Sequence, residues 1–182
     1  FHKLYKELLN FCTLDLSSFY FDIRKDVLYC DSINSKKRKN CVIVLNIILE
    51  SLLKWFAPIL VFTTEEIYNL INKNNESIHE NDFVKIPSNW QNDKLNMKWS
   101  SLFKIKQDAN IAIEEKRANK EIGSSLEAEI KLVLNKDKYK LLDKLDLEDY
   151  FIVSKAEREL SNNDEIKVEV KKAQGQKCER CW

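Results

Sequence analysis

The scarcity of glycine is the sequence feature that most restricts how this chain can fold. Only two glycines and two prolines occur in its 182 residues. Folds that bind dinucleotides or nucleotides hold the phosphates in loops whose several glycines let the backbone approach closely. A kinase, P-loop or Rossmann fold is therefore disfavoured. Apolar residues make up 44% of the chain, which is enough to bury real cores in one domain of good size or two small ones.

Charge, cysteine content and hydropathy restrict the environment and the partners. The net charge is +1, so any surface that binds nucleic acid must be a local patch of cations. Five cysteines, an odd number in a Lys-rich chain, fit the reduced thiols of a cytosolic protein better than a disulfide framework. No apolar run approaches the roughly 18 residues of a membrane span. We therefore expect a soluble, cytoplasmic protein without a membrane partner.

Helical periodicity dominates the first part of the chain. A helix is expected from the first residue, with a break at residues 15–18 and a second helix after it. The clearest helix carries an apolar stripe that we expect to be buried, made of Val42, Leu45, Leu49, Leu52 and Phe56. Thr63 and Glu66 have the spacing of a capping box, which predicts a further short helix through Ile71.

The second part of the chain changes from a helical to a strand pattern. A long helix is predicted over residues 94–121, with Gly123 placed as a left-handed C-terminal cap. Its expected buried side is formed by Leu95, Trp99, Leu102, Ala109 and Ile113. Apolar residues then alternate from Leu126 to Leu134, which indicates a half-buried strand. Two shorter strands are predicted at residues 150–153 and 166–170, with a small helix at residues 138–145. The predicted fold class is mainly α: a helical bundle over residues 1–121, followed by a small mixed α/β unit over residues 122–173.

The sequence contains no recognisable catalytic constellation. The only two histidines, His2 and His79, have no neighbour that would complete a nucleophile–base pair, so both are expected at the surface. Cys12, Cys30 and Cys41 lack the spacing of metal ligands and are expected to be small buried hydrophobes. No catalytic residue is predicted.

The positive features suit RNA better than small-molecule chemistry. Lys36, Lys37, Arg38 and Lys39 form a basic run between two apolar helices, where it could meet a phosphate backbone or simply stay solvated. Farther along the chain, cations and one aromatic residue extend the candidate RNA surface: Lys54, Trp55, Lys116, Arg117 and Lys120. Trp55 fits a base-stacking platform and a core position equally well.

A Cys-x-x-Cys pair stands at the end of the sequence. The spacing of Cys178 and Cys181 suits two of the four ligands of a tetrahedral zinc ion. A thiol redox pair is the alternative, although such pairs favour a strand-to-helix turn in a thioredoxin-like unit, which this tail does not show. Because no second pair follows, we expect residues 174–182 to be the start of a truncated zinc-binding motif.

Four segments resemble a known family in the same order along the chain. Residues 16–29 (LSSFYFDIRKDVLY) and 55–68 (WFAPILVFTTEEIY) closely resemble the anticodon-binding helical domain of isoleucyl-tRNA synthetases. Residues 122–128 (IGSSLEA) and 177–182 (KCERCW) are similar to the C-terminal region of the same enzymes. The related class I synthetases for valine, leucine and methionine share the helical bundle, but the combination of segments resembles the bacterial isoleucine enzyme.

The resemblance implies a function for the chain as part of a larger ATP-dependent ligase. The catalytic and editing domains would precede Phe1, so ATP would bind only through that absent core, whose His-x-Gly-His and Lys-Met-Ser-Lys-Ser signatures do not occur here. This region would grip the anticodon stem-loop of isoleucine tRNA, act with the remainder of the same synthetase chain as a monomer, and be inactive alone.

The resemblance also assigns two groups of residues. Arg38 and Lys39 stand where the family has a paired basic motif, with Lys39 in place of an arginine. Cys178 and Cys181 stand at the first zinc pair, so zinc is expected in the full-length protein. Two other readings of the sequence remain open: a helical module that binds a protein partner without RNA, and a thiol redox unit.

Overall fold

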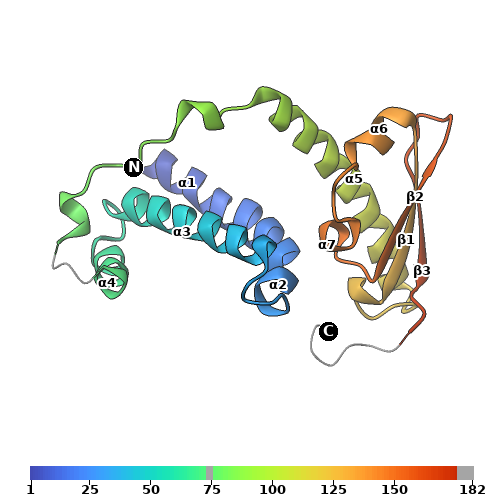
Figure 1. Ribbon diagram of the computed structural model, residues 1–182, viewed down its shortest axis with the longest axis horizontal. Helices are drawn as coiled ribbons and strands as arrows, with labels where there is room; N and C mark the ends of the chain where they lie inside the picture. The colour runs from blue at the N-terminus through green and yellow to red at the C-terminus, as the bar shows by residue number, and fades with distance from the viewer. Residues whose placement is uncertain (73–75, 176–182) are drawn as a thin grey trace. The chain divides into compact units, whose positions relative to one another are not determined.

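Two compact units make up the chain, Phe1–Trp90 and Gln91–Trp182. The computed structural model describes residues 1–72 and 76–175 (Figure 1). The predicted division after residue 121 differs from this one, because the long helix packs against the C-terminal sheet and belongs to the second unit. Within the described residues, no helix is both long and apolar enough to cross a membrane. The fold class is as predicted, mainly α with a small α/β unit.

Helices build the N-terminal unit. They follow one another as α1 (His2–Asn10), the π-helix η1 (Phe11–Phe21), α2 (Asp22–Tyr29), α3 (Lys36–Phe56) and α4 (Val61–Ile71), and then the short 3₁₀ turns η2 (Ile78–Glu80) and η3 (Ser88–Trp90). Helix α2 packs against α3, and both α3 and α4 contact η2. The side chains of Tyr20 and Cys41 join η1 to α3, with 3.6 Å between Oη and Sγ.

The break predicted at residues 15–18 is a change of helix type. The backbone stays helical from α1 through η1 into α2, with both flanking residues of η1, Asn10 and Asp22, in the right-handed helical conformation. The Ser18 hydroxyl donates to the Thr13 carbonyl five residues earlier, at 2.9 Å. Serine and aspartate side chains compete for backbone hydrogen bonds, and here the helix widens into a π-helix and continues.

The buried face of α3 differs from the predicted stripe. Leu49 is 40% exposed and Val42 is 41% exposed, while Leu45, Leu52 and Phe56 are half-buried. The buried residues of this helix are Cys41, Ser51 and Leu53. Because almost every position from Cys41 to Leu49 is apolar, the helix carries several overlapping stripes, and periodicity cannot select the one that its neighbours cover.

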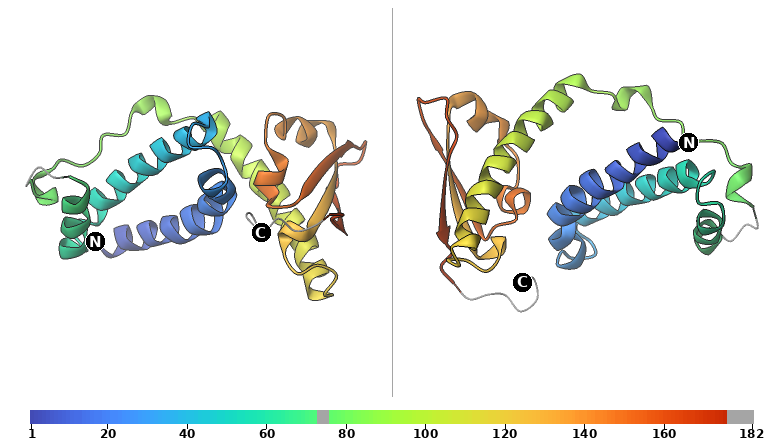
Figure 2. Two further views of the ribbon diagram at one scale, coloured as in Figure 1. Left: turned by 60° about the horizontal axis from the view of Figure 1, so that its bottom comes forward. Right: turned by 180° about the vertical axis from the view of Figure 1, so that it is seen from behind.

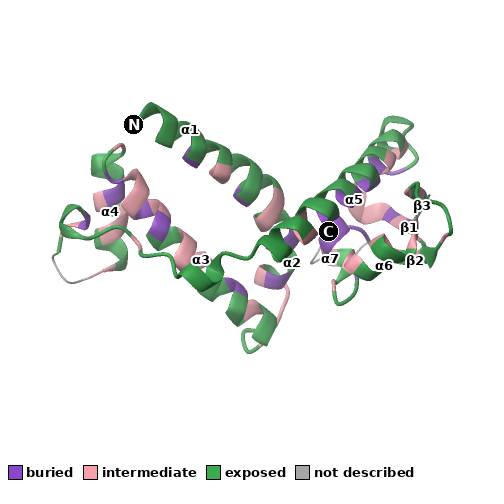
Figure 3. Ribbon diagram, turned by 90° about the horizontal axis from the view of Figure 1, so that it is seen from above, coloured by how far each residue is buried: buried purple, intermediate pink, exposed green. Residues whose placement is uncertain are grey.

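A small core joins α3, α4 and η2. Leu53, Ala57 and Ile78 form this cluster, and Ile67 and Tyr68 of α4 pack against it. Helix α4 begins at Val61 without a side-chain cap, so the predicted capping box of Thr63 and Glu66 is wrong. Figure 3 shows how little of this unit is fully buried, because most of each helix surface is exposed or intermediate.

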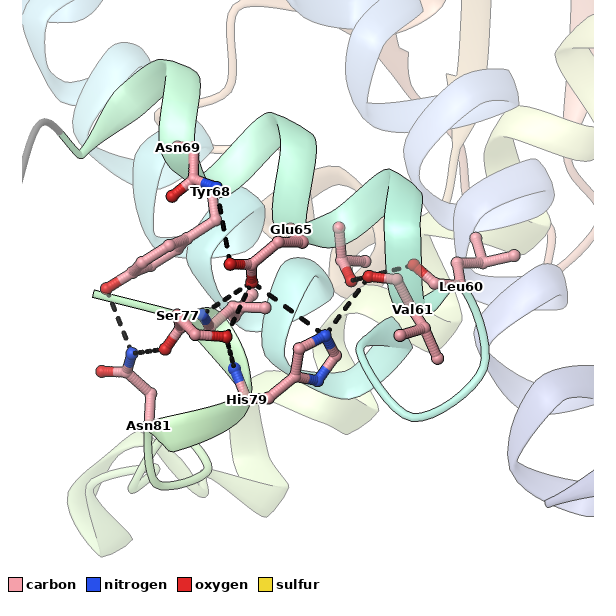
Figure 4. Close-up of polar contacts among 10 residues, drawn as sticks. Leu60, Val61, Glu65, Tyr68, Asn69, Ser77, His79 and Asn81 are labelled. Carbon is pink, nitrogen blue, oxygen red and sulfur yellow. Dashed lines mark hydrogen bonds and ion pairs between the residues drawn. The ribbon is translucent and has the colours of Figure 1, made fainter. Parts of the chain in front are cut away.

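Glu65 fastens η2 to α4. Its carboxylate Oε2 accepts hydrogen bonds from the Ser77 hydroxyl and from the Ile78 backbone N–H, both at 3.0 Å (Figure 4). His79 Nε2 lies 4.0 Å from the same oxygen and 3.3 Å from the Val61 carbonyl. Burial alone would raise the pKa of Glu65, but the hydrogen bonds from Ile78 and Ser77 outweigh burial and lower it.

The C-terminal unit is a two-layer α/β structure. Its elements are α5 (Asp93–Ala118), the 3₁₀ turn η4 (Ser125–Glu127), β1 (Ala128–Leu134), α6 (Lys136–Leu141), α7 (Leu147–Phe151), β2 (Lys155–Leu160) and β3 (Lys167–Lys172). The strand order is β2-β1-β3. Strand β1 pairs with β2 in parallel and with β3 antiparallel. The predicted strands at 126–134 and 166–170 are confirmed as β1 and β3, and β2 was not predicted.

Helix α5 covers one face of the sheet (Figure 2). Its buried side is spaced as an amphipathic stripe of Leu102, Ile105, Lys106, Ala109 and Ile113. Opposite this stripe, every second residue of β1 is fully buried: Ala128, Ile130, Leu132 and Leu134 are each 0% exposed. Leu102, Ala109 and Ile113 were predicted to be buried, whereas Leu95 is 50% exposed because the first turns of α5 extend past the sheet.

The strand predicted at residues 150–153 is a helix end. The aromatic and β-branched run there is typical of a strand, but Asp146 caps α7 through the Asp149 backbone N–H. Ile152 then ends the helix in the left-handed conformation, with φ 58°. The buried Lys106 ammonium donates to the Tyr150 carbonyl, and a cation is favourable at this end of a helix. Tertiary contacts therefore overrode the local preference.

The outer face of the sheet is a lattice of alternating charges. Lys155 pairs with Glu129 at 3.0 Å and with Glu157 at 2.7 Å. Lys131 pairs with Glu159, and Lys167 of β3 pairs with Glu169 at 2.8 Å. The pKa of Glu157 is lowered by the hydrogen bond and charge of Lys155, and that of Glu169 by Lys167 in the same way. This face is exposed and close to electrically neutral.

Replacing Leu132 with alanine should destabilise the C-terminal unit by about 2–5 kcal/mol, because the shorter side chain leaves a cavity on the buried face of β1. The matched control is Val133→Ala, at the next position of the same strand on the half-exposed outer face. We expect that change to cost about 1 kcal/mol or less. Urea unfolding measures the free energy of unfolding of both variants. Equal losses of stability would contradict the assignment of the two faces.

Glu65→Gln should loosen η2 from α4, since an amide replaces the carboxylate that accepts the Ser77 and Ile78 hydrogen bonds. The control is Glu66→Gln at the exposed neighbouring position. Because the pKa of Glu65 is lowered from its ordinary 4.5, its stabilising contribution is present above pH 4.5 and is lost as the pH falls through the folded-state value.

Amide hydrogen exchange at Ile78 reports this contact. Exchange, corrected for the intrinsic rate at each pH, should rise at acid pH in the wild type. In Glu65→Gln, whose neutral amide oxygen is a weaker acceptor, exchange should be faster than in the wild type above pH 4.5 and independent of pH. Glu65 would not hold η2 against α4 if the Ile78 amide were equally protected in the wild type and in Glu65→Gln.

Candidate nucleic-acid interface

The basic run forms the first turn of α3. Ser35 caps this helix, its Oγ accepting from the Arg38 backbone N–H at 3.4 Å. The same hydroxyl donates to Asp31 Oδ2 at 2.9 Å. The loop between α2 and α3 is thus tied to the helix start, which fixes the direction in which the basic side chains leave the backbone.

Arg38 and Lys39 are engaged within this loop. The Arg38 guanidinium donates to the Asp31 backbone carbonyl at 3.0 Å, and Arg38 is half-buried. Lys39 Nζ lies 3.5 Å from Asn34 Oδ1. Arg38 therefore shapes the loop as much as it offers charge, whereas Lys36, Lys37 and Lys39 are exposed.

The position of these lysines favours an external anion. The first turn of α3 contains no acidic residue, although the N-terminal end of a helix carries partial positive charge and is normally complemented by anions. Lys36 and Lys37 add further positive charge at the same end. A phosphate bound there would receive both the lysine charges and the helix end.

Two exposed apolar side chains flank the run and were not singled out from the sequence. Tyr29, the last residue of α2, and Ile33, in the following loop, are each 73% exposed. An exposed aromatic ring beside cations is the combination on which unpaired RNA bases stack. The sequence offered one signal for Tyr29, an aromatic residue within a few positions of the lysines, but it stood in a segment that was assigned to a helix.

Lys54 and Trp55 lie at the other end of α3. Eighteen residues of helix separate Lys54 from Lys36, or roughly 27 Å along the axis, so the structure does not bring these cations together. Lys54 Nζ pairs with Glu50 Oε1 at 2.9 Å, and its side chain is 15% exposed. Trp55 is half-buried. The Lys54 ammonium is thus already paired within its own helix, and Trp55 lies between the two alternatives, stacking platform and core, that the sequence left open.

Arg117 and Lys120 belong to the second unit. They border a cavity of about 540 Å³ at the C-terminal end of α5, together with Lys172 from the end of β3. Arg117 pairs with Glu114 at 2.6 Å. Lys116 pairs with Glu121 at 2.8 Å, and this hydrogen bond lowers the pKa of Glu121. Lys172, far from the others in sequence, is the cation that sequence reasoning missed here.

Helix α5 ends through Lys120 instead of Gly123. Lys120 has φ 59°, and Gly123 is not among the residues with positive φ. The Glu121 N–H bonds the Lys116 carbonyl at 3.0 Å and the Lys120 N–H bonds the Arg117 carbonyl at 2.9 Å, which closes the helix in the manner of a left-handed cap. The position of the Lys120 side chain is thereby tied to the end of the helix.

The predicted metal ligands Cys178 and Cys181 lie outside the described residues. Within residues 1–72 and 76–175, no group of three or more His, Cys, Asp or Glu side chains is arranged to hold a metal ion. Cys41 is buried as expected, while Cys12 and Cys30 are half-buried. His2 and His79 are both exposed.

Comparison with known proteins gives a consistent result. The family model for the anticodon-binding domain of tRNA ligase matches residues 1–132. An isoleucine–tRNA ligase of Pelagibacter ubique is 59% identical over the whole chain. The corresponding ligase of Methylacidiphilum infernorum is 41% identical over the whole chain, and that of Gluconobacter oxydans is 36% identical over 98% of it. The chain spans about a fifth of the length of each of these relatives.

Proposed function

Because the chain belongs to the family of anticodon-binding domains of tRNA ligases, we propose that it holds the anticodon stem-loop of isoleucine tRNA for an isoleucine–tRNA ligase. The remainder of the synthetase chain would attach isoleucine with ATP, and this region alone would be inactive. We further propose that the protein acts in the cytoplasm as a monomer. Identity of 59% to an isoleucine–tRNA ligase over the whole chain supports the choice of amino acid.

The observation that carries the RNA contact is the exposed lysine group at the start of α3. Lys36, Lys37 and Lys39 stand at a helix end that already attracts anions, and Tyr29, at the end of the preceding helix, exposes its ring. Phosphates would bind the lysines, and an unpaired base would stack on Tyr29. Arg117, Lys120 and Lys172 are a second candidate phosphate contact on the C-terminal unit.

Zinc is proposed for the full-length protein only. Cys178 and Cys181 would supply two thiolate ligands, and two further ligands would complete a tetrahedral site. Such a site would stabilise the fold around it, because binding free energy of a structural zinc is also folding free energy.

Replacing Lys36, Lys37 and Lys39 with alanine should weaken binding of isoleucine tRNA by several-fold to a hundredfold. Each lost phosphate contact also lowers the magnitude of the log–log salt slope by roughly 0.7 to 0.9. Arg38 is left in place because it fastens the loop through Asp31. Filter binding over a range of salt concentrations measures both quantities.

The charge-matched control replaces Lys131, Lys155 and Lys167 with alanine. These lysines are paired with glutamates on the outer face of the sheet. Because those charges are already neutralised, affinity and salt slope should change little. If the α3 variant kept the affinity and slope of the wild type, the lysines would be only a solvated helix end. Absence of any tRNA affinity in the wild type would instead support a protein-interaction module.

Metal analysis of the full-length protein tests the zinc proposal. The wild type should hold one zinc per chain, and Cys178→Ser together with Cys181→Ser should release it. An unchanged zinc content in the double variant would show that other residues form the site. If the double variant lost a thiol of depressed pKa while its metal content stayed unchanged, the redox pair would be favoured.

A further inference from the structure

A groove of about 490 Å³ lies between α5 and the start of β3 in the C-terminal unit, and we call it the α5–β3 groove. Its apolar lining consists of Ile111 and Ala112 of α5, Ile166 immediately before β3, and Val168 within β3. Ile111 is 54% exposed, and the other three residues are half-buried. The groove therefore leaves apolar surface accessible to a ligand.

The groove exists because α5 covers the inner face of β3 incompletely. Val168 stands opposite Leu132 in the strand register, and Leu132 belongs to the fully buried face of β1. Alternate residues of a strand share a face, so Ile166, Val168 and Val170 form one apolar row. Val170 is 8% exposed, whereas the first two members of the row are only half-buried. Further cover for these two must come from another segment.

Carboxylates border this apolar lining. Two come from α5 and two from the turn before β3, namely Asp108, Glu115, Asp164 and Glu165. All four are exposed, and within residues 1–72 and 76–175 none of them takes part in an ion pair. Glu114, by contrast, pairs with Arg117 at 2.6 Å. The lining also includes Lys138, whose ammonium donates to the Asp164 backbone carbonyl at 2.6 Å. The groove thus carries an excess of negative charge.

The acidic turn before β3 is held in place before any ligand arrives. Asn135 Nδ2 donates to Asp164 Oδ1 at 2.8 Å. Asn135 also caps α6, because its Oδ1 accepts from the Lys138 backbone N–H at 2.9 Å. Within the turn, the Asn163 N–H donates to Ser161 Oγ at 3.1 Å. A wall fixed in this way loses little conformational freedom on binding.

These properties select a basic ligand. Four unpaired carboxylates repel a nucleic acid, and a purely apolar segment would desolvate them without pairing them. A cationic segment gains from the complementary charge. We propose that the α5–β3 groove docks a basic amphipathic segment of a partner protein. An apolar side chain of that segment would cover Ile111 and Val168, and its lysines or arginines would pair with the four carboxylates. This inference goes beyond anticodon binding and does not depend on it.

The experiment titrates a labelled peptide, one leucine flanked on each side by two lysines, with the full-length protein and follows fluorescence anisotropy. Asp108→Asn together with Glu115→Gln should weaken binding roughly five-fold or more and flatten its salt dependence, because charge pairs are lost. Ile111→Ser should weaken binding by roughly the same factor with the salt dependence of the wild type, because only apolar contact is lost. In the charge-matched control, Glu157→Gln and Glu169→Gln neutralise carboxylates that lysines already pair on the outer face of the sheet. This control should bind the peptide as the wild type does.

A second peptide, with serine in place of the leucine, should bind the wild type more weakly than the first. The proposal is overturned if the double variant of Asp108 and Glu115 binds the leucine peptide as tightly as the control does. It is also overturned if the full-length wild type does not bind that peptide, because the groove would then be closed by the remainder of the synthetase chain.

Affinity for isoleucine tRNA separates this groove from the RNA surface. Asp108→Asn together with Glu115→Gln should bind the tRNA at least as tightly as the wild type, because the change removes negative charge without touching a phosphate contact. Weaker tRNA binding by this variant would make the groove part of the RNA surface and would contradict a protein partner there.

Discussion

Complete burial of one face of β1 is the constraint on which the C-terminal unit depends. Four alternate side chains of this strand are 0% exposed, and the same strand carries the backbone pairing of both its neighbours. A shift of one residue in the pairing of this strand would turn those four side chains toward water, so its register is strongly specified. The positions of β2 and β3, and of the α5 stripe that covers the sheet, follow from that register.

Sequence predicted those parts of the fold in which one pattern dominated. The alternation in β1 had no competing interpretation and was confirmed, and three residues of the predicted α5 stripe, Leu102, Ala109 and Ile113, are buried while Leu95 is not. The α3 stripe failed because too many of its positions are apolar, so the choice of face depended on distant residues such as Ile78. Strand β2 was missed because its residues are mostly charged; they pair with lysines and glutamates of β1, which local pattern cannot reveal.

The candidate site was predictable in its charges but not in its contacts. The basic run at α3 was visible as four consecutive cations, yet its division into a loop-fastening Arg38 and exposed lysines requires the carbonyl of Asp31. Lys172 joins Arg117 and Lys120 only through the return of β3 to the end of α5.

The charge lattice on the outer face of the sheet has a consequence for how the protein meets a polyanion. Alternating lysines and glutamates a few ångströms apart cancel one another's fields within a short distance, well inside the Debye length of roughly 8 Å at physiological salt. A nucleic acid approaching that face gains no electrostatic acceleration. Although the sheet carries many lysines, a nucleic acid should therefore first bind at cations that have no neighbouring glutamate. The distribution of uncompensated positive charge decides where the first productive collisions occur.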